Sequence, residues 1–159
     1  MNIRVGFGYD VHRLVKGREL ILGGVKIDHH EGLDGHSDAD VLTHVLCDAL
    51  LGAACLRDIG YHFPDTDERY KGVKSTFLLQ QVVALLEKEG FGIGNIDATI
   101  CAERPKLNPH IEEIQKNLAN CMQIGTQDVS IKATTTEKLG FTGREEGMSA
   151  YAVVLIYKK

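Results

Sequence analysis

Residues 35–50 read GHSDADVLTHVLCDAL, a polar turn that leads directly into an apolar segment. The apolar residues recur at helical spacing, which predicts a helix over residues 38–55 with one face in the protein core. Either Asp38 or Asp40 can cap this helix, because each carboxylate can accept the free N–H groups of its first turn. His44 falls one turn inside the helix. The fold is therefore expected to hold an imidazole at the border between core and surface.

The composition is typical of a globular protein. The chain has 159 residues, 43% of them hydrophobic and 25% charged, which suits a single domain over residues 1–159. A net charge of -4 and the absence of Trp argue against a nucleic-acid partner, because such proteins carry basic surfaces and aromatic stacking platforms. No apolar run is long enough to span a membrane.

Cysteine usage and the start of the chain indicate a cytoplasmic location. Cys47, Cys55, Cys101 and Cys121 form no CxxC pair and lie in segments of predicted helix or strand, as reduced thiols do. From Met1 the chain enters a predicted strand at once, so no targeting segment is expected.

The order of the elements predicts an α+β fold, an α/β sandwich in which helices pack on one face of a mixed β-sheet. The helix that begins at Ser75 is expected to bury its apolar residues, Phe77 among them. Predicted strands cover residues 3–12, 93–103, 128–136 and 148–157, a hairpin covers 18–27, two further helices cover 75–89 and 110–122, and irregular loops cover 57–74, 104–109 and 137–147.

Three residues form a candidate metal site. Asp10 and His12 stand two residues apart on the first strand and project from the same face. With His44 they make a set of one carboxylate and two imidazoles, which suits catalytic Zn²⁺ with an open position, or else Mn²⁺ or Mg²⁺. The alternative is that all three are ordinary polar residues at the ends of elements. Asp48 either orients His44 or is a surface carboxylate of the helix.

Two segments carry groups that suit a phosphate. His36 and Ser37 lie beside the free N–H groups of a helix start, although the same turn can serve only as a cap. Residues 132–138 read KATTTEK, where hydroxyls and lysines suit phosphate but Thr also simply favours strands. A bound cation would explain a carboxylate, Glu137, among phosphate-binding groups. Residues 6–8 (GFG) lack the third glycine and the helix of a dinucleotide site.

The loop over residues 57–74 contains the sequences DIG at 58–60 and FPDTD at 63–67. Their carboxylates can bind sugar hydroxyls or a metal, and they can equally cap turns. A loop of this length in a compact domain is usually functional or disordered.

Six motifs in order give the chain a resemblance to a known family: GYDVHR at 8–13, GHSDADVLTHVLCDALLGA at 35–53, DIG, FPDTD, AERPKLNPH at 102–110 and KATTTEKLGFTGREEG at 132–147. Over nearly its whole length the chain resembles the 2-C-methyl-D-erythritol 2,4-cyclodiphosphate synthases of the non-mevalonate isoprenoid pathway. The resemblance implies a lyase that converts 4-diphosphocytidyl-2-C-methyl-D-erythritol 2-phosphate to the cyclic diphosphate. The 2-phosphate attacks the β-phosphate and CMP leaves.

The resemblance also implies the roles of individual residues. Asp10, His12 and His44 are then the Zn²⁺ ligands, and Glu137 binds a Mg²⁺ or Mn²⁺ that bridges the substrate's α- and β-phosphates. Positioning and charge neutralisation then carry the catalysis, because the nucleophile is already part of the substrate.

His36 and Thr135 are implied to stabilise the transition state, and residues 102–108 to recognise cytosine largely through backbone groups. The implied substrate contacts are Asp10, Val11, His12, His36, Ser37, Asp58, Ile59, Gly60, Phe63, Pro64, Asp65, Thr66, Asp67, Ala102, Glu103, Arg104, Pro105, Lys106, Leu107, Asn108, Thr134, Thr135, Thr136, Glu137, Phe141 and Arg144.

The family resemblance further implies a homotrimer with active sites between subunits. A cavity on the threefold axis of such trimers can hold an isoprenoid diphosphate, with Arg144 near its mouth. Tyr151 stands in the last strand where some members carry an acidic residue.

Two other classes of function fit the same residues. A metal-dependent phosphohydrolase would use the Asp-x-His…His site with water as the attacking group. A non-catalytic metal- or nucleotide-binding module would use it without turnover. The reaction products discriminate between the three.

Overall fold

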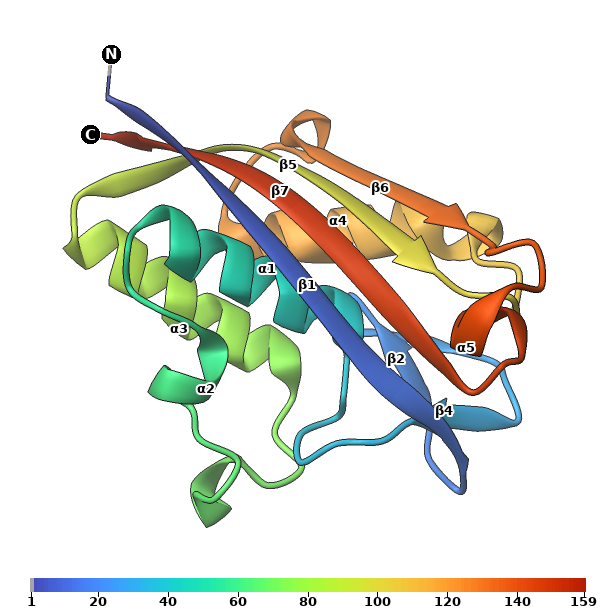
Figure 1. Cartoon of the computed structure of the whole chain (residues 1–159). Coiled ribbons are helices and arrows are strands. Elements are labelled where there is room, and N and C mark those ends of the chain that lie inside the picture. The colour runs from blue at the N-terminus through green and yellow to red at the C-terminus, as the bar shows by residue number, and fades with distance from the viewer. Residues whose placement is uncertain (1) are drawn as a thin grey trace.

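The computed structural model describes residues 2–159; Met1, from which the sequence predicts direct entry into a strand, lies outside this range. The described chain forms β1 (Ile3–Lys16), β2 (Leu20–Leu22), β3 (Val25–Ile27), β4 (Glu31–Leu33), α1 (Val41–Ala53), α2 (Ile59–His62), η1 (Glu68–Tyr70), α3 (Ser75–Lys88), β5 (Phe91–Cys101), η2 (Asn108–His110), α4 (Ile111–Met122), η3 (Thr126–Asp128), β6 (Val129–Thr134), α5 (Gly140–Gly143) and β7 (Gly147–Lys158). Figure 1 shows their arrangement.

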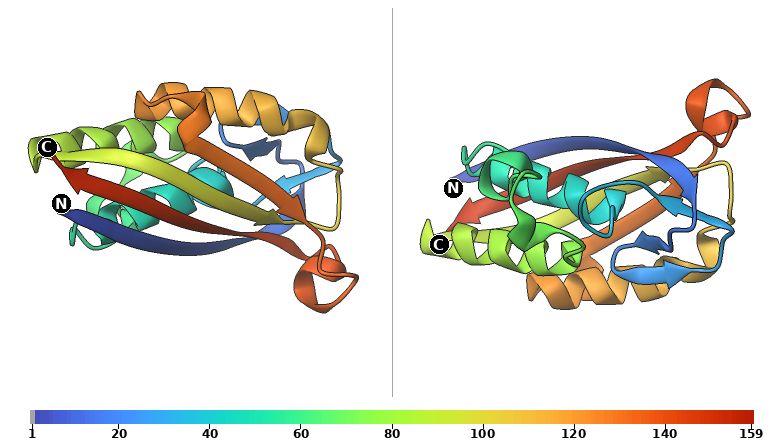
Figure 2. Two further views of the ribbon diagram at one scale, coloured as in Figure 1. Left: turned by 90° about the horizontal axis from the view of Figure 1, so that it is seen from above. Right: turned by 90° about the horizontal axis from the view of Figure 1, so that it is seen from below.

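A five-stranded sheet with the order β4-β1-β7-β5-β6 forms one layer, and β2 and β3 pair as a separate hairpin. The sheet is mixed, because β5 and β6 are parallel while the β1–β7 and β5–β7 pairs are antiparallel. Helices α1, α3 and α4 cover one face of the sheet, as the view from below in Figure 2 shows. The predicted α+β fold with helices on one sheet face is confirmed.

Strand β1 and helix α1 approach each other unusually closely. Alternate residues of β1 face the helix, and two of them are the glycines Gly6 and Gly8. A Cβ at Gly6 would lie 1.9 Å from the carbonyl oxygen of Ala49, and one at Gly8 would lie 2.4 Å from that of Val45. The GFG sequence therefore serves helix–strand packing, and the next residues on the same face of β1 are Asp10 and His12.

The buried core lies between the sheet and the helices. Phe77, which was expected in this core, is 47% exposed, so that prediction is wrong. Of its neighbours, Leu79 lies in the core, and Leu78 is buried as well. The other face of the sheet is apolar over β1 and β7, where its exposed large side chains are Ile3, Val5, Phe7, Tyr9, Val11, Tyr151, Val153 and Tyr157.

The structure differs from the predicted elements mainly in short segments. Strand β1 continues four residues past His12, where it pairs with β4. The loops predicted over 57–74 and 137–147 contain the one-turn helices α2 and α5. Elements this short carry no measurable periodicity, and only a cap such as Asp58, whose carboxylate accepts the N–H of Tyr61 at 2.9 Å, marks them. Within residues 2–159, no helix combines the length and apolarity needed to cross a bilayer.

Candidate metal and substrate site

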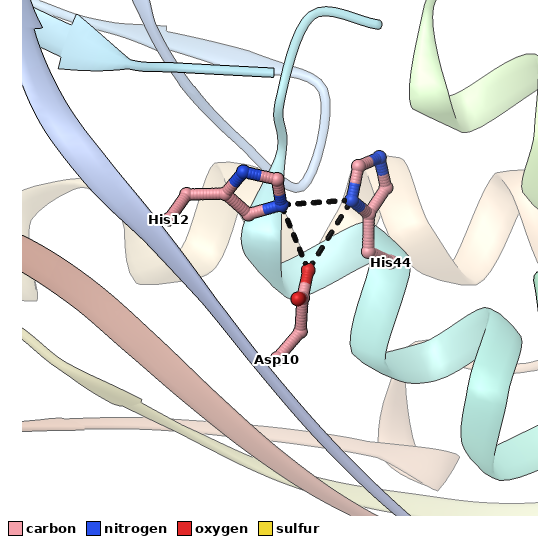
Figure 3. Close-up of side chains that lie close together, drawn as sticks. All are labelled: Asp10, His12 and His44. Atoms are coloured by element: carbon pink, nitrogen blue, oxygen red, sulfur yellow. Dashed lines mark hydrogen bonds and ion pairs between the residues drawn. The ribbon is translucent and has the colours of Figure 1, made fainter. Parts of the chain in front are cut away.

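Asp10 and His12 on β1 meet His44 on α1, and their polar atoms point at one another (Figure 3). Oδ2 of Asp10 lies 2.9 Å from Nε2 of His12 and 3.2 Å from Nδ1 of His44. The two ring nitrogens lie 3.1 Å apart. The structure thus brings the three predicted metal ligands together as a group that could hold a metal ion.

Hydrogen bonds on the far side of each ring decide which nitrogen faces the group. Nδ1 of His12 lies 2.6 Å from the backbone carbonyl of Asp34. A carbonyl can only accept, so Nδ1 carries the hydrogen and the lone pair of Nε2 in the neutral ring points inward. Nε2 of His44 lies 2.8 Å from Oγ of Ser75 and 3.0 Å from Oγ of Ser37. Both rings are therefore held by their outer nitrogens, as metal-ligating histidines usually are.

The charges of this group suit a divalent cation. Burial alone would raise the pKa of Asp10, but the two neighbouring imidazoles of His12 and His44 outweigh it and hold that pKa well below its usual range. Burial lowers the pKa of His12, while the nearby Asp10 carboxylate and the hydrogen bond to the Asp34 carbonyl raise it, and the net shift is upward. An ionised carboxylate and two inward lone pairs are the donor set of a metal site that keeps one position open.

The two aspartates of the polar turn cap different helices. Asp40 caps α1 by accepting the N–H of Thr43 at 3.0 Å, and it also accepts the N–H groups of Gly23 and Gly24 in the β2–β3 turn. Asp38 instead accepts the N–H of Ser75, the first residue of α3, at 3.1 Å. The polar turn therefore ties α1, α3 and the hairpin together at the metal group.

A cavity of about 380 Å³ opens beside the metal group. It brings together residues of the polar turn, of α2 and of the loop that follows, which the sequence analysis had singled out. Nε2 of His36 lies 3.3 Å from the carbonyl of Asp67, which links the turn to that loop. The lining residues are His12, Gly35, His36, Ser37, His44, Ile59, Gly60, Phe63, Asp65, Tyr70, Val73 and Leu78.

The expected contact residues of segments 102–108 and 134–137 follow the ends of β5 and β6. The N–H of Ala102 donates to the carbonyl of Thr134, and the N–H of Lys138 lies 3.4 Å from Oε2 of Glu103. Exposed Glu137 lies beside Thr135, with 3.4 Å between its Oε1 and the Thr135 hydroxyl. Residues 102–108 and 134–144 do not line the 380 Å³ cavity of the same chain. Phe141 instead lines a second cavity, of about 650 Å³, together with Val11 and His12.

Sequence reasoning missed the side chains that hold the site in place. Ser75 contacts His44, and Arg18 donates to the carbonyls of Gly35 at 3.1 Å and Ser37 at 2.7 Å. Neither residue carries a local signal of this role. Asp48 is neither a partner of His44 nor a free surface group: its carboxylate accepts the N–H of Ile59 at 2.8 Å and fastens α2 to α1.

Comparison with known proteins identifies the family of this chain. The model of the YgbB family matches residues 3–157. The protein named 2-C-methyl-D-erythritol 2,4-cyclodiphosphate synthase in Bacteroides thetaiotaomicron is 66% identical over 158 residues, 99% of each chain. The protein of that name in Desulfitobacterium hafniense is 61% identical over 156 residues, 98% of this chain and 99% of the other.

Solved structures support the same family assignment. The CDP complex of IspF from Plasmodium falciparum has a TM-score of 0.87 and 34% identity, covering 99% of this chain and 97% of the other. The bifunctional IspDF from Campylobacter jejuni has a TM-score of 0.95 and 44% identity, and the match covers 99% of this chain but 42% of the longer protein. The chain therefore belongs to the YgbB family, the family of the 2-C-methyl-D-erythritol 2,4-cyclodiphosphate synthases.

Proposed function

We infer that this chain converts 4-diphosphocytidyl-2-C-methyl-D-erythritol 2-phosphate to 2-C-methyl-D-erythritol 2,4-cyclodiphosphate and CMP, a step of the non-mevalonate route to isoprenoid precursors. Identities of 61–66% over whole chains to enzymes named for this product support the activity. The convergence of Asp10, His12 and His44 beside a cavity is the structural observation that carries it.

The reaction is an intramolecular phosphoryl transfer. An oxygen of the 2-phosphate forms a bond to the β-phosphorus, and the bond from that phosphorus to the oxygen bridging the α-phosphate breaks, so CMP leaves with the electron pair. The nucleophile belongs to the substrate. The protein therefore has to fold a flexible anion so that two phosphates meet, which is catalysis by positioning and charge neutralisation.

Asp10, His12 and His44 are proposed to hold Zn²⁺, and Glu137 to hold Mg²⁺ or Mn²⁺ with the substrate's diphosphate. Bound in these places, the cations would supply Lewis-acid polarisation of the phosphates and neutralise the charge of the leaving group. The chain's own part is to turn the inner nitrogen of each imidazole toward the metal, which the hydrogen bonds of the outer nitrogens to Asp34 and Ser75 support.

The remaining contacts are proposed from the family pattern. His36 and Thr135 would stabilise the transition state, and Ser37 would bind the phosphate region. The ribose would contact Asp58 and Gly60. The cytosine would contact the backbone of residues 102–108, and the other expected contacts are residues 63–67, Phe141 and Arg144.

Active sites between the subunits of a homotrimer would unite the two groups of site residues. Within one chain, the metal group and residues 102–108 lie in separate places, which supports a site completed by a second subunit. The exposed apolar face of β1 and β7 supplies a surface for such contacts. The P. falciparum structure is a CDP complex, which supports a cytidine diphosphate pocket in the present chain as well.

Residues 1–159 are proposed to act as one catalytic domain. The four cysteines are free thiols, which supports a cytoplasmic location. By the same resemblance the threefold axis of the trimer is proposed to accept an isoprenoid diphosphate. Tyr151 would stand on its wall, because it lies on the outer sheet face with its ring 5.0 Å from that of Tyr9.

Phosphorus NMR of the purified protein with substrate and Mg²⁺ tests the proposed reaction. CMP together with two coupled resonances of a cyclic diphosphate is the expected result. CMP with an acyclic product would instead indicate a phosphohydrolase. If the folded, zinc-loaded protein shows no turnover, the result would favour a non-catalytic binding module.

A strong chelator and the variant His44→Ala provide the controls for this assay. Both are expected to abolish turnover, and added Zn²⁺ should restore only the chelated wild-type protein. Full activity of a metal-stripped sample would contradict the metal-assisted mechanism.

A further inference from the structure

Ser75 links a metal-ligand histidine to a carboxylate on another segment. Oγ of Ser75 lies 2.8 Å from Nε2 of His44 and forms a short hydrogen bond with Oδ1 of Asp38. The three groups come from α3, α1 and the polar turn, so that the link exists only in the folded chain.

The direction of this link follows from what each group can donate. Both oxygens of Asp38 accept from the N–H of Ser75, and the Ser75 hydroxyl donates to Oδ1 as well. The hydroxyl has only this one hydrogen, so the Ser75 oxygen can only accept a hydrogen bond from His44. His44 must therefore carry its hydrogen on Nε2. This leaves Nδ1, which faces Asp10 and His12, with a free lone pair.

Ser37 is a weaker candidate for the same role. Its oxygen lies 3.0 Å from Nε2 of His44, but it also accepts the N–H of Ala39 at 3.1 Å. Among residues 2–159 no carboxylate takes its hydrogen, and the other hydroxyl in reach is that of Ser75, at 3.3 Å. The Ser37 hydroxyl is thus free to turn, whereas that of Ser75 is held.

Burial adds to this constraint. The Ser75 side chain is fully buried, and its own N–H donates to both carboxylate oxygens of Asp38 at 3.1 Å. Backbone and side chain of Ser75 therefore hold the same carboxylate from two directions. Water has no access with which to substitute for the hydroxyl if it is removed.

We propose that Ser75, held by Asp38, is a positioning residue that fixes the ring orientation and tautomer of His44 for metal binding. The inference rests on the metal site of the proposed function and adds to it the residue that orients one ligand. Outer partners of this kind contribute about 10–100-fold to metal affinity.

Zinc affinity, measured by competition with a chromophoric chelator, tests the proposal without any turnover assay. Ser75→Ala keeps the backbone N–H that donates to Asp38 at the start of α3 but loses the hydroxyl. We expect about 10–100-fold weaker zinc binding with the thermal unfolding of the metal-free protein little changed. Ser75→Thr, which restores a hydroxyl, should recover affinity. Thr76→Ala is the matched control in the same helical turn and should bind zinc as the wild type does.

Wild-type affinity in Ser75→Ala would overturn the proposal while leaving the metal site intact, and so would a loss of affinity confined to Ser37→Ala. If Ser75→Ala does not fold, ¹⁵N spectra of the wild-type metal-free protein decide. With the imidazole neutral, His44 should carry its hydrogen on Nε2, and an Nδ1–H tautomer would overturn the proposal. Failure of the wild-type protein to bind zinc would instead count against the proposed function itself.

Discussion

Nε2 of His12 lies 3.1 Å from Nδ1 of His44, although neither ring nitrogen can donate to the other when both rings are held by their outer nitrogens. Two lone pairs and the Asp10 carboxylate repel one another at this distance unless a cation or a proton lies between them. Outer hydrogen bonds of this kind are typical of metal-ligating histidines, which supports a metal ion as the group that fills this position.

Removing one of these ligands should abolish tight metal binding. His12→Ala leaves one imidazole and one carboxylate. We expect zinc affinity to fall by roughly 100-fold or more, a larger decrease than the removal of an outer hydrogen-bond partner would cause. Zinc binding is measured as the zinc content after gel filtration and as the affinity in competition with a chelator. His30→Ala removes an exposed imidazole of the loop before β4 and should leave zinc content unchanged. Equal zinc content in both variants would show that the metal binds elsewhere.

Asp48 makes stability depend on pH in a predictable direction. Burial raises the pKa of its carboxyl above the ordinary value of 3.8, and the N–H of Ile59 offsets this only in part. The folded chain thus holds the Asp48 proton more tightly than the unfolded chain. The associated stability is present below pH 3.8 and is lost as the pH rises through the raised pKa.

Asp48→Asn should therefore unfold at higher urea concentration than the wild type at neutral pH, because the amide oxygen still accepts from Ile59 and no charge is buried. The difference should shrink as the pH falls toward 3.8. A variant less stable at neutral pH would mean that the ionised carboxylate is itself stabilising.

Much of the site followed from local pattern. Strand alternation put Asp10 and His12 on one face, and helical spacing put His44 at the edge of the core. These inferences need only the geometry of single elements and one assumption, that the first strand packs against the first helix.

What could not be predicted depends on how distant elements dock. Asp38 stands immediately before α1, yet its carboxylate caps α3, with a partner 37 residues away. The role of Ser75 follows from the same docking. Phe77 satisfies the helical pattern of α3 but is exposed, because an apolar stripe wider than the packed face leaves one side chain outside, and only packing decides which.

The apolar outer face of β1 and β7 is expected to form the subunit contacts of the proposed trimer. Phe7 on β1 is 63% exposed in a single chain and lies near Tyr151 of β7. Phe7→Asp would bury an unpaired charge in the assembly, which costs several kcal/mol, so we expect a monomer by light scattering. Phe77→Asp changes an aromatic residue that is also exposed, but on α3, and should keep the wild-type mass. Equal masses for both variants would place the subunit contacts elsewhere.

Gly8 sets the distance between β1 and α1 and, through it, the metal group. A Cβ at this position would lie 2.4 Å from the carbonyl oxygen of Val45 and 2.9 Å from its Cγ2, so that strand or helix must shift. We expect Gly8→Ala to cost about 1–3 kcal/mol in urea unfolding. Zinc affinity should fall as well, because Val45 adjoins His44 and the shift separates that ring from Asp10.

Gly52 is the matched control, because it lies exposed in the same helix and a Cβ there would meet nothing within 4 Å. Gly52→Ala should raise stability by roughly 0.5–1 kcal/mol, since alanine loses less backbone entropy in a helix, and zinc affinity should stay as in the wild type. If Gly8→Ala lost stability but kept full zinc affinity, the metal group would tolerate displacement of α1. The close packing of β1 and α1 would then serve the core alone.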